Sequence, residues 1–120
     1  MTGGLGYIGS HCSLKLLEKG KNILIIDSLV NSSLKVKSKI EFLLNQSKNN
    51  NKGLLFFRKG DIRDKKWLKK IFEEFNTSNK NIISVFHFAG LKSVEESTYF
   101  PLDYWDVNVN GTLNLLKIMS

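Results

Sequence analysis

The sequence has one cysteine and no long apolar run, and each scarcity excludes a class of protein. With Cys12 alone the chain cannot form an intramolecular disulfide, which fits a reducing compartment. No apolar run reaches the roughly 18 to 20 residues of a membrane span, and no charged, then apolar, leader opens the chain. We therefore expect a cytoplasmic protein without membrane contact.

Arginine and histidine are also scarce. The formal net charge is +7, yet only Arg58 and Arg63 are arginines and the lysines are spread along the chain. The densest lysine cluster, at residues 65–70, falls on the outer face of a predicted helix, where a solvated surface explains it, so nucleic acid is not an expected partner. His11 and His87 lack acidic or cysteine partners at metal-ligand spacing, so we predict structural roles for both and no metal site.

The chain does contain an alternation of helical and strand-like patterns. The predicted helices cover residues 7–19 and 34–45, a segment that begins after Asp64, and the segment from Pro101 to the end. The predicted buried strands cover residues 22–27, 54–57 and 82–88. This alternation predicts an α/β fold with a doubly wound parallel sheet.

Glycines at positions 3, 6 and 9 precede the first helix, and Asp27 ends the next strand, eighteen residues after Gly9. In a Rossmann dinucleotide-binding unit such glycines make a tight turn, admit the pyrophosphate and allow close helix packing. The carboxylate accepts hydrogen bonds from the adenosine ribose and repels a 2′-phosphate, which favours NAD over NADP. The alternative is that these glycines serve turns and helix caps, and that Asp27 is a strand-end turn residue.

Two further polar residues follow predicted strands at the same sheet edge. Asp61 is a candidate for a hydrogen bond to the adenine amine, and the alternative is capping of the following helix, a role that Asp64 fills. Lys92 can reach a ribose or phosphate from the loop after residues 82–88, although a lysine there is also a common solvated loop residue.

Four segments together resemble the UDP-glucose 4-epimerases, which are extended short-chain dehydrogenase/reductases. They read T-G-G-L-G-Y-I-G-S-H at 2–11, G-D-I-R-D at 60–64, H-F-A-G-L-K-S-V-E-E-S at 87–97 and P-L-D-Y-W-D-V-N-V-N-G-T at 101–112. The resemblance covers the chain apart from a loop around residues 45–52. It departs from the family where Val107 precedes Asn108, since many members have two successive asparagines, the first contacting NAD.

The resemblance implies which residues contact NAD. For the pyrophosphate they are Gly3, Gly6, Tyr7, Ile8 and Gly9; for the adenosine ribose and its phosphate, Asp27, Asn31 and Ser32. For the adenine they are Asp61 and Ile62, and for the nicotinamide side, Phe88, Ala89, Gly90 and Lys92.

The implied reaction interconverts UDP-galactose and UDP-glucose, as in galactose metabolism, by hydride removal and return at C4, with a tyrosine phenolate as base. That tyrosine belongs to a Y-x-x-x-K motif, and residues His11, Asp103 and Asn108 follow Tyr7, Tyr99 and Tyr104 at that spacing. We therefore predict no catalytic residue in this sequence, no UDP-sugar-binding domain, and no activity of the chain alone.

In the family the glycine loop follows a strand, whereas here it follows Met1 directly. We interpret residues 1–120 as a partial NAD-binding Rossmann domain without its first strand and its C-terminal half, with an internal or misassigned start. The first strand belongs between residues 22–27 and 82–88, so we expect the isolated chain to be marginally stable or prone to aggregation.

Other functions stay open. The chain is alternatively a non-catalytic nucleotide-binding remnant, or part of a related nucleotide-sugar epimerase or dehydratase. By resemblance the helix from Pro101 helps to form a homodimer in the complete enzyme, and its apolar stripe is equally compatible with core packing.

Overall fold

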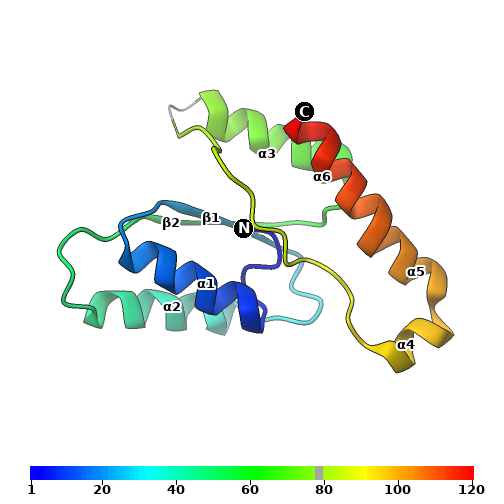
Figure 1. The fold of residues 1–120 in the computed structure, drawn as a ribbon, viewed down its shortest axis with the longest axis horizontal. Coiled ribbons are helices and arrows are strands. Elements are labelled where there is room, and N and C mark those ends of the chain that lie inside the picture. The colour runs from blue at the N-terminus through cyan, green and yellow to red at the C-terminus, as the bar shows by residue number, and fades with distance from the viewer. Residues whose placement is uncertain (78–79) are drawn as a thin grey trace. The chain divides into compact units, whose positions relative to one another are not determined.

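The computed structural model describes residues 1–77 and 80–120, which form two compact units (Figure 1). The first, here called the sheet unit, comprises Met1–Lys59 and Phe86–Phe88. The second, the helical unit, comprises Gly60–Val85 and Ala89–Ser120. Within the described part of the chain, no helix combines the length and apolar character needed to cross a membrane. The assignment of residues 1–120 to one partial domain stays a prediction.

The sheet unit alternates helices and parallel strands, as predicted. Its elements are α1 (Tyr7–Glu18), β1 (Ile23–Asp27), α2 (Leu34–Gln46) and β2 (Leu55–Lys59). The two strands pair in parallel, from Ile23 beside Leu55 to Asp27 beside Lys59. The α/β fold class is therefore confirmed.

The core of the sheet unit lies between β1 and the two helices. Figure 1 shows α1 and α2 side by side along one face of the strands. Their buried apolar side chains form one cluster with those of β1 and of the glycine loop: Leu5, Leu17, Ile23, Ile25, Ile40 and Leu44. Burial of such side chains is the main stabilising contribution to the unit, at roughly 1.5 to 3 kcal/mol for each one fully buried.

The prediction of a third strand over residues 82–88 is wrong for the described residues. Only His87 forms a bridge, in parallel with Thr2, and Thr2 also bridges Ile26. Thr2 donates its N–H to the Phe86 carbonyl at 3.0 Å. Because Thr2 is the single residue that pairs with this segment, the ladder does not extend over the predicted length. Thr2 nevertheless occupies the position between the two segments at which the sequence predicts the central strand.

The helical unit contains α3 (Lys65–Thr77), α4 (Val94–Tyr99), α5 (Pro101–Trp105), the π-helical turn η1 (Asp106–Asn110) and α6 (Gly111–Met119). Asp64 caps α3 as predicted, since its Oδ1 accepts a hydrogen bond from the Trp67 N–H at 3.0 Å. The helix predicted from Pro101 is confirmed, although η1 interrupts its α-helical geometry. The short helix α4 is not among the predicted elements.

Candidate functional site

The glycine loop is bonded directly to the end of β1. Gly3 donates its N–H to the Ile26 carbonyl at 2.8 Å and has a φ of 62°, a conformation that glycine adopts at little cost. Gly6 then donates to the Gly3 carbonyl at 3.1 Å. The chain thus turns sharply from the Thr2 bridge into α1.

Gly9 packs against this turn from the first turn of α1. A Cβ atom at Gly9 would lie 2.4 Å from the Gly3 carbonyl oxygen and 2.8 Å from the Gly4 Cα, and neither backbone atom can move away cheaply. At Gly6 a Cβ would approach only the Gly3 oxygen, at 3.3 Å. The two glycines therefore differ, because Gly9 is required by packing and Gly6 is not.

The start of α1 is open. Its N-cap is Gly6, which has no side chain to accept a hydrogen bond from the first-turn amides. Tyr7 and Ile8 in this turn are exposed, at 84% and 63%. Unsatisfied first-turn amides and the helix dipole make such an end suitable for an anion, and a phosphate is the kind of group that it would accept.

Asp27 is buried, at 8% exposure, and its carboxylate is bonded on both oxygens. Its Oδ2 accepts from the Leu5 N–H at 3.0 Å, which ties the glycine loop to β1. Its Oδ1 accepts from the Leu29 N–H at 3.0 Å and from the Ser32 hydroxyl at 2.7 Å. A carboxylate has about four acceptor positions, so Asp27 retains capacity for one further donor.

The loop after β1 carries the other two residues predicted beside Asp27. Asn31 is exposed, whereas the Ser32 hydroxyl is engaged by Asp27. Leu29, between them and β1, has a φ of 63°, a backbone conformation unusual for leucine. The Leu29 bond to Asp27 holds this strained residue, and sequence reasoning did not find it because leucine gives no signal for a left-handed conformation.

Phe88, which the resemblance assigns to the nicotinamide side of NAD, lies in the sheet unit with the segment Phe86–Phe88. Phe88 donates its N–H to the Thr2 carbonyl at 3.0 Å, and its side chain is half-buried. Beside it, the Thr2 hydroxyl and His87 Nδ1 are hydrogen-bonded at 2.5 Å. The structural role of His87 stays a prediction, and this hydrogen bond is compatible with it.

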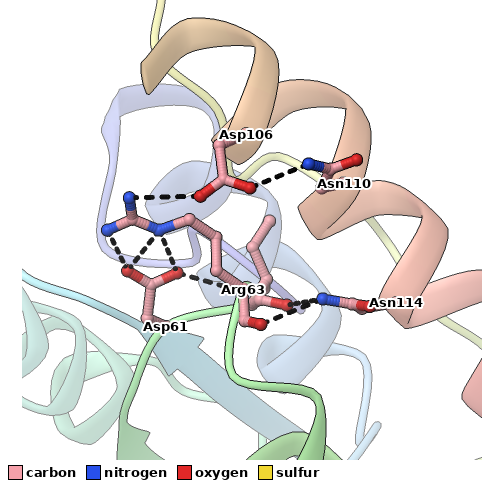
Figure 2. Close-up of polar contacts among 6 residues, drawn as sticks. Asp61, Arg63, Asp106, Asn110 and Asn114 are labelled. Carbon is pink, nitrogen blue, oxygen red and sulfur yellow. Dashed lines mark hydrogen bonds and ion pairs between the residues drawn. The ribbon is translucent and has the colours of Figure 1, made fainter. Parts of the chain in front are cut away.

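In the helical unit, Asp61 forms an ion pair within its own loop (Figure 2). Its carboxylate accepts from the Arg63 N–H at 2.9 Å and from the guanidinium Nη2 at 2.7 Å. The hydrogen bond from Arg63 lowers the pKa of Asp61, and the carboxylate in turn raises the pKa of Arg63. Arg63 also lies 3.7 Å from a carboxylate oxygen of Asp106.

Ile62 is buried, at 4% exposure, and its peptide is held by α6. The Asn114 carboxamide donates to the carbonyls of Ile62 at 3.3 Å and Arg63 at 3.0 Å (Figure 2). Gly111 packs on the Ile62 side chain, where a Cβ would lie 2.6 Å from Ile62 Cδ1. Sequence reasoning missed Asn114, because an asparagine in a helix interior gives no sign of a partner 52 residues away.

The loop that contains Ala89, Gly90 and Lys92 is held by the Asn108 side chain of η1. Asn108 Oδ1 accepts from the Leu91 N–H at 2.8 Å, and Nδ2 donates to the Leu91 carbonyl at 3.0 Å. Ala89 and Gly90 are half-buried, whereas Lys92 is exposed. The sequence singled out Asn108 only through its departure at Val107 and gave no indication of this contact.

The phenol of Tyr104 is hydrogen-bonded both as a donor and as an acceptor. The Tyr104 hydroxyl donates to Glu96 Oε2 at 2.6 Å and accepts from the Ser93 N–H at 3.1 Å. Loss of solvation, followed by the hydrogen bond to Glu96, raises the pKa of Tyr104. A phenolate base needs the opposite shift, so Tyr104 is poorly suited to proton abstraction.

Three comparisons with known proteins agree over the whole chain. The family model described as GDP-mannose 4,6 dehydratase matches residues 1–120. UDP-glucose 4-epimerase uge1 of Schizosaccharomyces pombe is 42% identical over 120 residues, which are 100% of this chain and 30% of that protein. Bifunctional protein GAL10 of Candida maltosa is 44% identical over 118 residues, which are 98% of this chain and 70% of that protein.

A solved structure shares the backbone arrangement. The UDP-glucose-4-epimerase of Stenotrophomonas maltophila, with bound NAD and formylated UDP-arabinopyranose, has a TM-score of 0.83 and 38% identity to this chain. The match covers 98% of this chain and 32% of that one, so the chain spans about a third of that enzyme and of the Schizosaccharomyces relative. Over its whole length the chain belongs to the GDP-mannose 4,6 dehydratase family, and within it the chain is a homologue of the UDP-glucose 4-epimerases.

Proposed function

We propose that this chain is a cofactor-binding part of an NAD-dependent UDP-glucose 4-epimerase. The observation that carries the proposal is the bond from the Leu5 amide to Asp27, which ties a glycine loop and an open helix start to a strand-end carboxylate. The likeness to an epimerase that holds NAD supports it.

The residues present fit the proposed cofactor. In the sheet unit, the pyrophosphate is assigned to the amides around Gly3, Gly6, Tyr7, Ile8 and Gly9, where the start of α1 has no capping side chain and carries the positive end of the helix dipole. The adenosine ribose is assigned to the remaining acceptor capacity of Asp27, with Asn31 and Ser32 beside it. Phe88 is assigned to the nicotinamide side.

The helical unit carries the other residues assigned to NAD. Asp61 and Ile62 are assigned to the adenine, and Ala89, Gly90 and Lys92 to the nicotinamide side. Arg63 bonds to both oxygens of the Asp61 carboxylate through its backbone N–H, Nε and Nη2, so a hydrogen bond from the adenine amine competes with Arg63 for these oxygens.

In the complete enzyme the proposed reaction is the interconversion of UDP-galactose and UDP-glucose at C4, within galactose metabolism. Bound NAD supplies reversible hydride acceptance. The proposed role of this chain is to bind and orient the cofactor. Because its sequence has no Y-x-x-x-K motif, we expect no turnover by the 120 residues alone. The proposed compartment is the cytoplasm.

A homodimer of the complete enzyme is also proposed. The segment Pro101–Trp105 and α6 expose apolar side chains that a partner would cover: Leu102, Trp105, Leu113, Leu116 and Met119. The sheet unit has no role in this part of the proposal.

Calorimetric titration of the 120-residue chain tests cofactor binding. We expect saturable one-to-one binding of NAD and at least about tenfold weaker binding of NADP, because a 2′-phosphate meets the Asp27 carboxylate. The variant D27N removes the charge and should narrow this preference; because it also replaces one oxygen that accepts a backbone N–H, its folding is checked alongside. Absence of saturable NAD binding by folded protein would overturn the proposal.

A coupled assay for UDP-glucose formed from UDP-galactose separates the candidate functions. Turnover by the chain itself would contradict the expected inactivity. NAD binding without turnover supports a cofactor-binding part, and it is also what a non-catalytic nucleotide-binding module would show. The two are distinguished when the same cofactor residues are substituted in a longer homologue, where loss of epimerase activity supports the first.

A further inference from the structure

The Asp61 carboxylate has no spare acceptor position while Arg63 is bound to it. Oδ1 accepts from the Arg63 backbone N–H at 2.9 Å and from Nε at 3.2 Å, and Oδ2 accepts from Nε at 3.0 Å and from Nη2 at 2.7 Å. A carboxylate accepts about four hydrogen bonds. A ligand that donates a hydrogen bond to Asp61 must therefore displace a donor group of Arg63.

Asp106 offers the same guanidinium a second carboxylate within the helical unit. Arg63 Nη1 lies 3.7 Å from Asp106 Oδ2 (Figure 2). A hydrogen-bonded ion pair is about 2.7 to 2.9 Å long, so an approach of about 1 Å would complete this second pair. Asn110 Nδ2 donates to Asp106 Oδ1 at 2.9 Å, so Oδ2 is the oxygen that faces Arg63.

The backbone around Arg63 is held, whereas its side chain reaches the solvent. Asn114 Nδ2 donates to the Arg63 carbonyl at 3.0 Å, and the Asp64 N–H donates to the Asp61 carbonyl at 3.0 Å. The Arg63 side chain is 40% exposed and that of Asp106 is 47% exposed. Ion pairs with this exposure form and break at little cost in free energy. A shift of the guanidinium from Asp61 to Asp106 thus requires no change in the loop backbone.

We propose that Arg63 is a specificity-determining residue for the base that Asp61 receives. A base with an amino group displaces the guanidinium from Asp61 to Asp106, and a base with a carbonyl group in its place leaves the guanidinium on Asp61. This inference rests on the proposed function, which assigns Asp61 to the adenine of NAD. It extends that function, because neither Arg63 nor Asp106 is among the residues assigned to the cofactor.

Adenine and hypoxanthine differ at this point of the ring. Adenine carries an amino group, which donates to a carboxylate, whereas hypoxanthine carries a carbonyl group, which only accepts. Binding of adenine therefore moves Arg63 and gains from the carboxylate of Asp106, which receives the displaced charge. Binding of hypoxanthine leaves Arg63 in place, so it gains nothing from Asp106.

Asp103 in α5 provides the matched control. The hydrogen bond to Asp61 raises the pKa of Arg63, and the charges of Asp106 and, more weakly, of Asp103 raise it further. Within residues 1–77 and 80–120, the carboxylates in ion-pair contact with Arg63 are those of Asp61 and Asp106. Substitution of Asp103 by asparagine therefore removes the same charge from a neighbouring helical segment without removing a partner of Arg63.

The first test is calorimetric titration of the full 120-residue chain with NAD and with nicotinamide hypoxanthine dinucleotide. We expect D106N to weaken NAD binding about two- to fivefold, the scale of one partly exposed ion pair. The affinity for the hypoxanthine dinucleotide should stay within about 1.5-fold, a change too small to reflect a lost ion pair. D106E keeps a carboxylate and should restore the NAD affinity, and D103N should change neither affinity.

Three results of this titration would overturn the proposal. They are an unchanged NAD affinity in D106N, an equal loss for both dinucleotides, and an equal loss in D106N and D103N. The last two would show a general effect of charge or of folding instead of a shift of Arg63.

The second test needs no ligand and follows the Asp106 carboxyl by carbon-detected NMR. Its readout is the rise in the pKa of Asp106 caused by Arg63→Gln, measured in the original chain and in D61N. Asparagine at position 61 keeps an oxygen for the Arg63 N–H and lacks the charge that holds the guanidinium. If Arg63 then pairs with Asp106, the rise is larger in D61N. An equal rise in both backgrounds would overturn the second position of Arg63.

Failure of the proposed function gives a different result. If the original chain folds and binds neither dinucleotide, the cofactor assignment fails and selection of the base fails with it. The pKa of Asp106 then still decides whether Arg63 moves between the two carboxylates.

Discussion

The carboxylate of Asp27 accepts a hydrogen bond from the backbone of Leu5, 22 residues earlier, at 3.0 Å. This contact joins the glycine loop to the end of β1, and the other Asp27 oxygen joins β1 to the loop that follows it. The residue proposed to bind the cofactor ribose thus also holds the two loops around it. Its substitution should affect folding and binding together.

We predict that Asp27→Ala destabilises the chain by about 2 to 3 kcal/mol, because the buried Leu5 amide and the partly buried Leu29 amide lose their partner. Ser32→Ala removes only one donor to the same carboxylate and should cost about 1 kcal/mol or less. Urea unfolding followed by circular dichroism measures both values. Equal stability of the two variants would contradict the structural role of Asp27.

The two glycines at the start of α1 should respond differently to the same substitution. Gly9→Ala places a methyl group against the Gly3 and Gly4 backbone and should destabilise the chain by about 1 to 3 kcal/mol. Gly6→Ala meets only one oxygen, at 3.3 Å, so it should fold nearly as well. If the pyrophosphate binds at the Gly6 backbone, Gly6→Ala should still weaken NAD binding, since the methyl group would hinder the close approach of the phosphate.

Thermal unfolding and NAD titration of both alanine variants separate packing from binding. Gly6→Ala with unchanged stability and tenfold or weaker affinity supports the assigned contact, on the scale of about 1.4 kcal/mol per tenfold change. Unchanged NAD affinity in a folded Gly6→Ala chain would contradict that contact.

The sequence predicted those elements whose pattern is local. The helical spacing of Leu68, Ile71 and Phe75 and the cap at Asp64 predicted α3, and the apolar run predicted β1. Residues 82–88 were as apolar, yet a strand needs a partner along its length, and among residues 1–77 and 80–120 only Thr2 forms a β-bridge with this segment. The residues of a segment do not indicate whether a partner strand lies beside it in the fold.

The same distinction separates the site residues that were found from those that were missed. Glycines and strand-end carboxylates have a recognisable spacing in the chain. Asn108 and Asn114 form hydrogen bonds with the backbone of loops 17 and 52 residues away. The sequence around an asparagine in a helix does not indicate such a distant partner. The π-helical geometry of η1 likewise depends on contacts made after folding.

Asp61 and Arg63 give a pH-dependent contribution to stability. The hydrogen bond from Arg63 lowers the pKa of Asp61 below its ordinary 3.8, so the stabilisation is present above about pH 4 and is lost as the pH falls through the lowered pKa. Both side chains are partly exposed, so the contribution should stay within about 1 kcal/mol. Arg63→Gln should raise the pKa of Asp61 toward its ordinary value.

Carbon-detected NMR titration of the Asp61 carboxyl measures this change. Lys69→Gln is the matched control, because it removes a cation from the exposed pair with Glu73 in the same unit. It should leave the pKa of Asp61 unchanged. A titration of Asp61 that is the same in the original chain and in Arg63→Gln would show that the ion pair between Asp61 and Arg63 does not persist in solution.

Ser13 in α1 has a buried hydroxyl that finds no hydrogen-bond partner among the described residues. Desolvation of such a group without a partner costs about 1 to 3 kcal/mol, and alanine is also the better helix former. We therefore predict that Ser13→Ala stabilises the chain, by about 1 kcal/mol. Ser10→Ala is the control, since the Ser10 hydroxyl donates to the Tyr7 carbonyl at 3.0 Å and its loss should be neutral or slightly destabilising.

Thermal and urea unfolding measure the change in stability of Ser13→Ala and Ser10→Ala. A rise in stability for Ser13→Ala alone shows that the hydroxyl is a net cost to the core beside Leu17. Loss of stability in Ser13→Ala would mean that the hydroxyl has a hydrogen-bond partner in solution, for example a buried water. Removal of a hydroxyl lowers stability through lost hydrogen bonding only when the hydroxyl is hydrogen-bonded. Ser13→Ala should leave NAD affinity unchanged, since Ser13 is fully buried and is not among the residues assigned to the cofactor.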